Sequence, residues 1–192
     1  MRYTLTAVAG VLIVDLAPRT DDRGFFARTF DVSEFAEHGL DTSIVQGNLS
    51  YNHRAGTLRG LHRQVPPYAE GKLVRCTAGA IVDVAVDVRP DSPTYGGHVM
   101  VELSAANRTA LFIPAYVAHG YQTLVDDTEV TYQVSGPYAP RGEQGFRYDD
   151  AAFGIAWPAP VTVISDKDAS WPLVDAAPSA PGGPAGAAVV TP

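Results

Sequence analysis

The stretch Val82-Asp83-Val84-Ala85-Val86-Asp87-Val88 decides the fold class of this chain. Its valines stand at every second position, so in an extended strand they share one face and the residues between them share the other. Such a strand has one dry side and one polar or cavity-facing side, which is typical of antiparallel sheets. The stretch therefore predicts a strand over Ala80–Arg89 with two faces of different character.

Similar short runs rich in Val, Ile, Leu and Tyr, broken by Gly, Pro, Asn and Asp, recur along the chain. They predict further strands over Val11–Leu16, Ser43–Leu49, Thr57–Gln64, Lys72–Thr77, His98–Leu103, Thr109–Ile113, Tyr121–Leu124 and Glu129–Ser135. A single short N-terminal helix is predicted after Asp31, which can cap it, with Glu34 three residues later and Gly39 at its end. This pattern predicts an all-β jelly roll or closed barrel, and such barrels can hold a ligand at one mouth.

The composition limits the classes of function. The chain has 192 residues, enough for one domain, with 14 Lys plus Arg against 21 Asp plus Glu and a net charge of −7. An acidic balance argues against nucleic-acid binding, although a few arginines could still hold a diphosphate. No apolar run is long enough to span a bilayer and no leader is evident, so we expect a cytoplasmic protein. Cys76 is the single cysteine, which excludes an internal disulfide and a thiolate metal cage.

The composition shifts near the C-terminus to Ala, Pro, Gly, Ser and Val, without any periodicity. Segments of this kind do not bury enough apolar surface to order themselves. We therefore expect one domain over residues 1–173 and a flexible tail over residues 174–192.

The segment Leu58-Arg59-Gly60-Leu61-His62-Arg63-Gln64 holds a histidine, the side chain best matched to proton transfer near neutral pH. Strict alternation places His62 and Arg59 on opposite faces. If both serve one site, a bulge is needed, and Gly60 is where a bulge would be tolerated. Taken alone, the segment is equally typical of a surface strand with a hydrogen-bonded histidine.

Other side chains could also carry chemistry. Lys72, at the start of a strand, could stabilise an enolate or a phosphate oxygen, and Asp168 could orient a histidine base. A plainer reading fits each segment as well: a solvated lysine, a core position for the strand residue Tyr132, and a polar loop around Asp168. His119, five residues after Pro114, matches the second half of the cupin pattern.

A metal site is not expected. Metal cupins need two histidines that flank one residue, and here the matching position reads His62-Arg63-Gln64. The five histidines include no pair with ligand spacing.

Two aromatic segments could contact a nucleotide. In Arg23-Gly24-Phe25-Phe26, the arginine could bind phosphate and a phenylalanine could pack against a base. We also expect at least one of these two phenylalanines in the core. Tyr138, in a loop rich in Gly and Pro, could stack on a base or cover a strand edge.

The order of the motifs along the chain is more specific than any one of them. From end to end of residues 1–173 the sequence resembles the dTDP-4-dehydrorhamnose 3,5-epimerases. The resemblance rests on Arg23–Phe26, Gln46–Asn48, Leu58–His62, Gly71–Val74, Asp83–Asp87, Ser92–Thr94, Leu103–Ser104, Ile113–Pro114, Ala118–Gly120, Tyr132, Tyr138–Pro140, Asp149–Asp150, Trp157–Pro158 and Ser165–Asp168.

The resemblance implies a double-stranded β-helix of the cupin type, without a cofactor, in a homodimer whose subunits exchange strands. It implies that His62 is the base and Asp168 its partner, that Lys72 stabilises the enolate oxygen, and that Tyr132 is the acid on the opposite face of the sugar. The implied substrate is a nucleotide-diphosphate sugar, bound by Arg23, Phe26, Gln46, Asn48, Arg59, His119, Tyr138, Glu143 and Lys167. General chemistry supports these roles, since a C–H beside a ketone is acidified and inversion needs a base and an acid on opposite faces.

Two departures leave the scope of the reaction open. The family commonly has glutamate at the position of Arg28 and aspartate at the position of Gly47. Because both fall in the nucleotide-binding region, a 3- or 5-mono-epimerase of another keto-deoxysugar is an alternative. A non-catalytic cupin that only binds a nucleotide sugar is a second alternative, and a metal cupin oxygenase is a third, disfavoured by the missing His-x-His.

Overall fold

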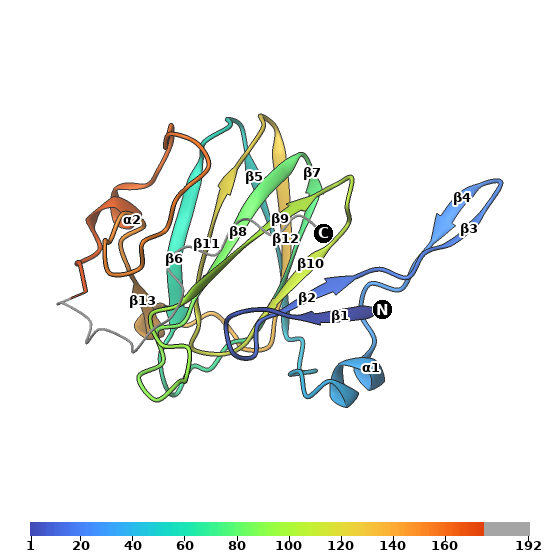
Figure 1. Cartoon of the computed structure of the whole chain (residues 1–192), viewed down its shortest axis with the longest axis horizontal. Coiled ribbons are helices and arrows are strands. Elements are labelled where there is room, and N and C mark those ends of the chain that lie inside the picture. The colour runs from blue at the N-terminus through green and yellow to red at the C-terminus, as the bar shows by residue number, and fades with distance from the viewer. Residues whose placement is uncertain (175–192) are drawn as a thin grey trace.

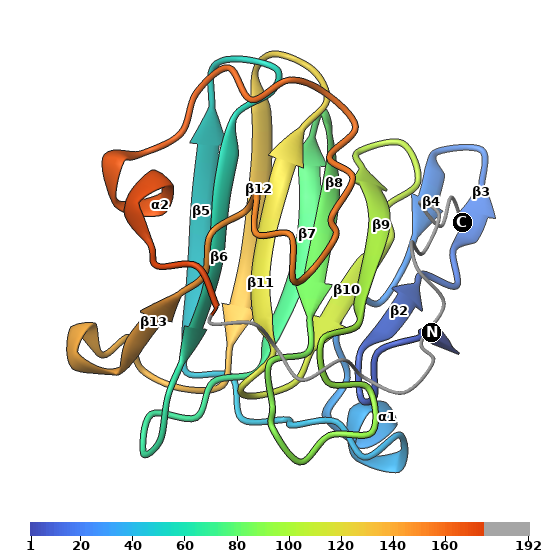
Figure 2. The same ribbon diagram turned by 60° about the vertical axis from the view of Figure 1, so that its left-hand side comes forward.

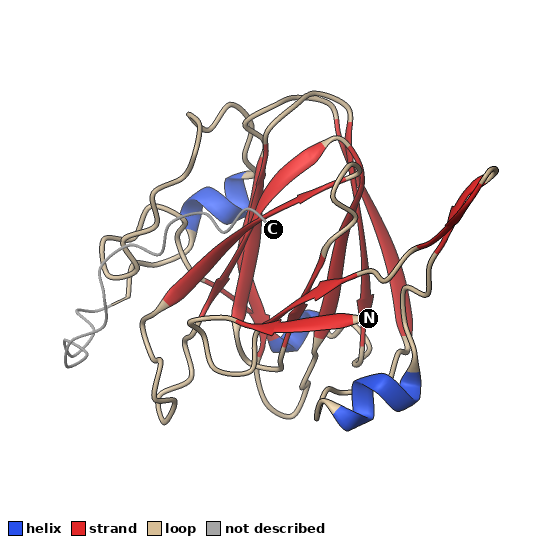
Figure 3. Cartoon of the chain, turned by 45° about the vertical axis from the view of Figure 1, so that its right-hand side comes forward, coloured by secondary structure: helices blue, strands red, loops and turns tan. Residues whose placement is uncertain are grey.

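The structure, a computed structural model, describes residues 1–174, and two antiparallel sheets face each other within it (Figures 1 and 3). The six-stranded sheet has the order β1 (Arg2–Leu5), β2 (Leu12–Asp15), β10 (Ala110–Ile113), β7 (Lys72–Ala78), β12 (Thr128–Val134) and β5 (Gln46–Asn52). The five-stranded sheet has the order β13 (Glu143–Gly145), β6 (Leu58–Gln64), β11 (Ala118–Thr123), β8 (Ala80–Val86) and β9 (His98–Ser104). This is the all-β, two-sheet barrel that the sequence predicts.

The remaining elements lie outside the two sheets. They are the hairpin of β3 (Arg19–Asp21) and β4 (Gly24–Phe26), the helices α1 (Val32–Glu37) and α2 (Asp166–Ser170), and the 3₁₀ turn η1 (Pro140–Gly142). Within the described part of the chain, no helix is long and apolar enough to cross a membrane. Apart from Val174, the predicted tail lies outside the described residues.

All nine predicted strands are present, with shifted ends. β5 begins three residues later than predicted and β11 begins three residues earlier. The strands β1, β3, β4 and β13 and the helix α2 were not predicted. Each of them has only three to five residues, too few for a hydrophobic period to show in the sequence.

The β8 strand has the two faces that its sequence predicts. Its valines are buried in an outer cluster on the face that points away from the other sheet, where they meet Leu61, Met100 and Phe153. Ala85 belongs to the inner cluster between the sheets, and Asp83, on the same side, is fully buried. The inner cluster is otherwise apolar, with Val74, Leu103, Leu111, Ile113 and Val130 among its members.

The C-terminal segment after β13 covers the outer valine face (Figure 2). Phe153 and the partly buried Trp157 pack into the outer cluster from this segment. Farther along, the Leu58 amide donates to the Val163 carbonyl at 2.8 Å, and the Gln122 side chain donates to the Ala159 carbonyl at 2.9 Å. The chain thus returns to β6 just before it forms α2.

The helix α1 begins as predicted. The Asp31 carboxylate accepts hydrogen bonds from the backbone amides of Ser33 and Glu34, and Gly39 follows the helix with a positive φ of 69°. The capping box does not close, because the Glu34 carboxylate accepts instead from the amino group of Met1 at 2.7 Å. Phe35 is buried and anchors the helix to the outer side of the six-stranded sheet.

The expectation that Phe25 or Phe26 enters the core is wrong. Both lie on the β3–β4 hairpin, which projects away from the sheets (Figure 1), and their side chains are 46% and 69% exposed. The ring of Phe25 lies against the guanidinium of Arg108, 4.6 Å from the ring centre. A hairpin that leaves both sheets has no core to enter.

A bulge at Gly60 sets the direction of the β6 side chains. His119 pairs with His62 and Tyr121 pairs with Arg59, so the register between β6 and β11 shifts by one residue. His62 and Arg59 therefore face the same side, as the sequence required if both were to serve one site. Gly60 has φ of +118°, and a methyl group there would lie 2.5 Å from the Gly120 Cα.

We expect Gly60→Ala to lower the free energy of unfolding by more than about 2 kcal/mol, because both the backbone conformation and the space exclude a side chain. Urea denaturation measures this. Gly47→Ala is the matched control, since Gly47 has open space around it, and its effect should stay within about 0.5 kcal/mol. Equal stability of the two variants would contradict the proposed bulge.

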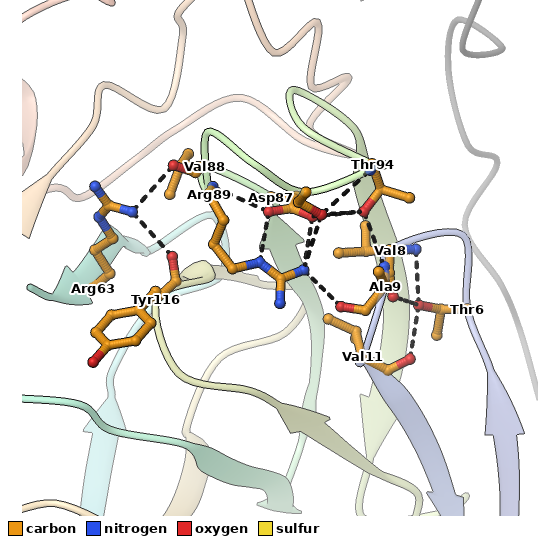
Figure 4. A network of polar contacts seen from close by, with 11 residues as sticks. Thr6, Val8, Ala9, Val11, Arg63, Asp87, Val88, Arg89, Thr94 and Tyr116 are labelled. Carbon is orange, nitrogen blue, oxygen red and sulfur yellow. Dashed lines mark hydrogen bonds and ion pairs between the residues drawn. The ribbon is translucent and has the colours of Figure 1, made fainter.

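Buried polar bonds hold the loop after β8 (Figure 4). Asp87 is fully buried, and its carboxylate accepts from Arg89, Ser92 and Thr94. The Arg89 guanidinium also donates to the Ala9 carbonyl at 2.7 Å, which ties the N-terminal strands to this loop. Burial alone would raise the pKa of Asp87, but these hydrogen bonds outweigh it and lower the pKa to about 2.

Asp87→Asn should therefore destabilise the protein in a pH-dependent way. Because the folded pKa lies below the unfolded one, the charge of Asp87 contributes about 2 kcal/mol that is fully present above about pH 4. This contribution is lost as the pH falls toward 2. The difference between wild type and variant, from guanidinium unfolding at several pH values, should shrink over that range, whereas the exposed Asp91→Asn in the same loop should show no such trend.

Candidate active site

Four of the polar side chains expected in the site, those of His62, Lys72, His119 and Tyr132, lie on the two inner faces of the barrel. Lys72 shares a face of β7 with Val74, and Tyr132 shares a face of β12 with Val130, both in the inner cluster. His62 lies opposite His119 across the β6–β11 pair, and His119 shares its face with Tyr121 of the inner cluster. The phenol of Tyr132 and the imidazole of His62 thus come from opposite sheets and both face inward.

His62 forms a hydrogen-bonded pair with Asp168 on α2. Its Nε2 lies 2.6 Å from Asp168 Oδ1, and the Gly60 amide donates to Oδ2 at 3.2 Å. Burial opposes ionisation of Asp168, but the hydrogen bond and charge of His62 outweigh it and hold the pKa of Asp168 below its usual range. Since the carboxylate occupies Nε2, Nδ1 of His62 is the nitrogen left for another partner.

The helix α2 brings Asp168 to this position. Its first turn is capped by Ser165, whose hydroxyl accepts from the Asp168 amide at 3.1 Å. Trp171 follows the helix, and its indole lies on Gly145, where a methyl group would come within 2.0 Å of the ring. The indole meets the His62 ring edge-on, with 6.4 Å between the ring centres. Trp171 therefore forms one wall beside the His62–Asp168 pair.

His119 forms a second pair of the same kind with Asp83. Its Nε2 lies 2.6 Å from Asp83 Oδ1, and the carboxylate is fully buried while the histidine side chain is 11% exposed. The other oxygen, Oδ2, is buried without a hydrogen-bond partner among the described residues. The polar face that the sequence predicts for β8 thus serves to hold an inward-facing histidine.

Lys72 and Tyr132 lie on neighbouring strands of the six-stranded sheet. The Lys72 ammonium is 3.1 Å from the carboxylate of Glu70, and both side chains are largely buried. Burial raises the pKa of Tyr132, Glu70 raises it further, and Arg59 opposes the change. The phenol of Tyr132, which any tyrosine keeps protonated near neutral pH, therefore holds its proton to a higher pH than usual.

Arg59 is held by a chain of polar contacts across the barrel. Its Nε donates to Asn52 Oδ1 at 2.8 Å, and Asn52 Nδ2 donates to the Tyr121 hydroxyl at 3.3 Å. That hydroxyl also lies 2.8 Å from Ser50 Oγ. This chain joins β5 to β6 and β11 and fixes the guanidinium on the inner side.

The residues expected to bind the nucleotide include a connected group. Lys167 Nζ donates to Glu143 Oε1 at 2.6 Å, and the Tyr138 hydroxyl donates to Glu143 Oε2 at 3.0 Å. The Tyr138 amide donates to Gln46 Oε1 at 2.7 Å. Asn48 lies opposite Tyr132 in the β5–β12 pair. The Tyr138 ring is 57% exposed, which leaves its face open for stacking.

Two expected binding residues are not brought to this group within the chain. Arg23 and Phe26 lie on the β3–β4 hairpin, on the other side of the molecule from β6 and α2 (Figures 1 and 2). The two departures also lie outside the inner faces. Arg28 pairs with Asp31 at the start of α1, and Gly47 stands next to inward-facing residues of β5 with open space around it.

Several residues of the site were not expected from the sequence. Glu70 pairs with Lys72, and Asp83 pairs with His119. Asn52 accepts a hydrogen bond from Arg59, and the Trp171 ring lies beside His62. The alternation of β8 marks Asp83 as inward-facing, but no pattern in the sequence marks its partner. Cys76 is buried, and burial raises the pKa of its thiol to about 11, which keeps the thiol in its unreactive protonated form. Within residues 1–174, no three His, Cys, Asp or Glu side chains gather as metal ligands.

Comparison with known proteins gives the family. The sequence model described as dTDP-4-dehydrorhamnose 3,5-epimerase matches residues 5–176. The dTDP-4-dehydrorhamnose 3,5-epimerase of Sinorhizobium fredii is 45% identical over 173 residues, covering 90% of this chain and 89% of that protein.

Solved structures agree. The dTDP-4-dehydrorhamnose 3,5-epimerase of Bacillus anthracis with TDP and PPi bound has a TM-score of 0.86 at 38% identity, covering 90% of this chain and 99% of that one. A 3'-monoepimerase of Streptomyces bikiniensis in complex with dTDP-quinovose has a TM-score of 0.80 at 33% identity, covering 88% and 85%. The chain belongs to the dTDP-4-dehydrorhamnose 3,5-epimerase family.

Proposed function

We propose that this chain inverts C3 and C5 of a dTDP-linked 4-keto-6-deoxyhexose by removing and returning protons beside the ketone. The observation that carries this proposal is the arrangement of the inner faces in a member of this family. A histidine on one sheet is paired with a carboxylate of α2, and a phenol and an ammonium lie on the other sheet. Inversion requires a base and an acid on opposite faces of the sugar ring.

His62 is proposed as the base. Asp168 accepts from Nε2–H, so the lone pair of Nδ1 is free to take the proton from the carbon next to the ketone. The imidazolium that forms is stabilised by the Asp168 carboxylate, which remains ionised because its pKa is held low.

Lys72 and Tyr132 are proposed to act on the resulting enolate. The Lys72 ammonium meets the negative charge that develops on the 4-oxygen, in a partly dry position where electrostatic stabilisation is strong. The Tyr132 phenol returns a proton to the face opposite His62, and its raised pKa keeps that proton available.

The polar residues around this centre are proposed to hold the rest of the substrate. Arg59 and His119 face the same side as His62 and would hold the sugar or the diphosphate. The connected group of Gln46, Tyr138, Glu143 and Lys167, with Asn48, would hold the nucleoside, with the exposed Tyr138 ring against the base. The acidic chain can still accept an anionic ligand, because Arg59, Lys72 and Lys167 bring three cationic side chains to this region.

We further propose a homodimer in which the β3–β4 hairpin of one chain completes the site of the other. Arg23 and Phe26 are 89% and 69% exposed on this hairpin, and they lie away from the inner face of their own chain. A hairpin with two exposed aromatic rings is an unfavourable surface for a lone subunit, and an exchange between two copies would cover it.

A 3- or 5-mono-epimerase is the second candidate function. The 33% identity to the 3'-monoepimerase of Streptomyces bikiniensis supports keeping it, since family membership alone does not separate the two scopes. A cupin that only binds a nucleotide sugar would not need both His62 and Tyr132 to face the interior of the barrel, and the inward direction of both side chains argues against it.

His62→Ala should reduce exchange with solvent deuterium by at least about a hundredfold at both C3 and C5, because the base is lost. Incubation of the 4-keto sugar nucleotide in D₂O, followed by NMR, measures the two positions separately. Exchange at both carbons by the wild-type protein supports the 3,5-epimerase, and exchange at one carbon supports a mono-epimerase.

His53→Ala is the control, since His53 is an exposed histidine outside the site. Tyr132→Phe should suppress return of the proton more than its removal. No exchange at either carbon by wild type would exclude both candidate reactions, and near-normal turnover by His62→Ala would show that the base lies elsewhere.

Mixing two impaired variants tests the proposed dimer. Phe26→Ala lacks part of the hairpin and His62→Ala lacks the base, so each alone should be impaired. After subunit exchange, the mixed dimer holds one site with both features intact, and activity should recover to about a quarter of wild type. If the hairpin served its own chain, mixing would restore nothing.

A further inference from the structure

Glu70 lies in the loop between β6 and β7, and its carboxylate is part of the proposed site. Its Oε1 is 3.1 Å from Lys72 Nζ, with only 8% of the Glu70 side chain and 13% of the Lys72 side chain exposed. An ion pair in water contributes little, but in an enclosed pair each charge depends on the other for its solvation. The position of the ammonium is therefore tied to that of the carboxylate.

The loop that carries Glu70 is fixed to the end of β12. The Gly71 amide donates to Ser135 Oγ at 2.9 Å, and the Ser135 amide donates to the Gly71 carbonyl at 3.0 Å. A methyl group at Gly136 would lie 2.4 Å from the Ala69 carbonyl oxygen, so the two segments are in close backbone contact. The backbone is thus fixed on both sides of Glu70, at Ala69 and at Gly71, so Glu70 does not lie on a free surface loop.

Lys72 lies opposite Val134, two residues along β12 from Tyr132, so the carboxylate paired with Lys72 is on the same face of the sheet as this phenol. Among the causes that raise the pKa of Tyr132, burial comes first and Glu70 is the charge that adds to it. The groups around this phenol include Arg59 on β6 and Tyr121 on β11, and the guanidinium of Arg59 acts in the opposite direction. Glu70 raises the pKa of Tyr138 as well, after the larger effect of Glu143.

We propose that Glu70 is a positioning residue of the reaction, which fixes the Lys72 ammonium at the mouth of the barrel and places a negative charge beside Tyr132. The proposal rests on the proposed function of the site. An ammonium has three donors, so one bonded to Glu70 leaves two for the 4-oxygen of the substrate. Without the carboxylate, the flexible lysine side chain would lose its preferred position, and a displacement of about 1 Å is enough to slow a reaction strongly.

The test compares Glu70→Ala, Glu70→Gln and the control Glu129→Gln, whose carboxylate lies on the outer side of β12 and binds Thr77. Glu70→Ala should lower kcat by about ten- to a hundredfold with little change in KM, because the ammonium is misplaced only with respect to the enolate. Glu70→Gln keeps an oxygen for Lys72 and should retain most of kcat at neutral pH. In the pH profile of kcat, however, the alkaline limb should move to lower pH. Glu129→Gln should match wild type in kcat, in KM and in the pH at which the alkaline limb falls.

A second measurement needs no substrate. The tyrosinate absorbance of the protein is titrated with alkali, and the difference from Tyr132→Phe isolates the Tyr132 phenol. Glu70→Gln should shift this titration to lower pH than in wild type, because a negative charge has been removed from its surroundings. Glu129→Gln should leave it unchanged.

The outcomes separate this proposal from the function on which it rests. An unchanged Tyr132 titration in Glu70→Gln, or an unchanged kcat in a folded Glu70→Ala, would overturn the role of Glu70 even if His62→Ala is inactive. If Glu70→Ala fails to fold, Glu70→Gln carries the test, since it preserves the size of the side chain. If wild type shows no exchange, the proposed function fails, and a shifted Tyr132 titration would then retain only the electrostatic part of the proposal.

Discussion

The hydrogen bond between His62 and Asp168 joins residues 106 positions apart, and much of the fold can be understood as the means of making it. A histidine on a strand cannot bring its own carboxylate, because its neighbours along the strand point elsewhere. The chain solves this by returning to β6 after covering the outer valine face, where α2 presents Asp168 to both the imidazole and the Gly60 amide. Because the Asp168 carboxylate is buried, breaking the pair would leave a polar group without a hydrogen-bond partner or water, which is costly.

The same constraint explains why two glycines cannot be replaced near His62. Gly60 permits the bulge that turns Arg59 and His62 to one side, and Gly145 leaves room for the Trp171 indole that closes the pair from its flank. Backbone at both positions lies against another segment at distances that no side chain allows. The geometry of the site thus depends on these two glycines, which have no side chain, as much as on its polar residues.

Patterns confined to a few neighbouring residues could be predicted from the sequence. The alternation of Val82–Val88 specifies two faces because the strand period is fixed, and Asp31 specifies a helix start because its carboxylate fits the first free amides. The partner of each inward-facing group could not be predicted in this way. Asp83 and His119 are 36 residues apart, and only the resemblance to a family, not any spacing, linked Asp168 to His62.

The outward path of the β3–β4 hairpin could not be predicted either, because aromatic residues are typical of cores and nothing local shows that a hairpin leaves its sheet. Arg23 and Phe26 matched the family motif, yet their own chain does not bring them to His62. A sequence motif shows which residues a chain has, but not which of them lie together in space. Neither strand periodicity nor motif spacing can predict a residue that a second copy of the chain would contribute.

The C-terminal segment that covers the outer valines has a consequence for synthesis on the ribosome. Both sheets, except for β13, are complete in sequence by Val134, so nearly the whole barrel can leave the exit tunnel while α2 is still inside it. A nascent barrel at that stage would have His62, the proposed base, but not the Asp168 carboxylate that pairs with it. The proposed site is therefore completed only after the C-terminal segment has folded over the outer valine face and brought α2 to β6.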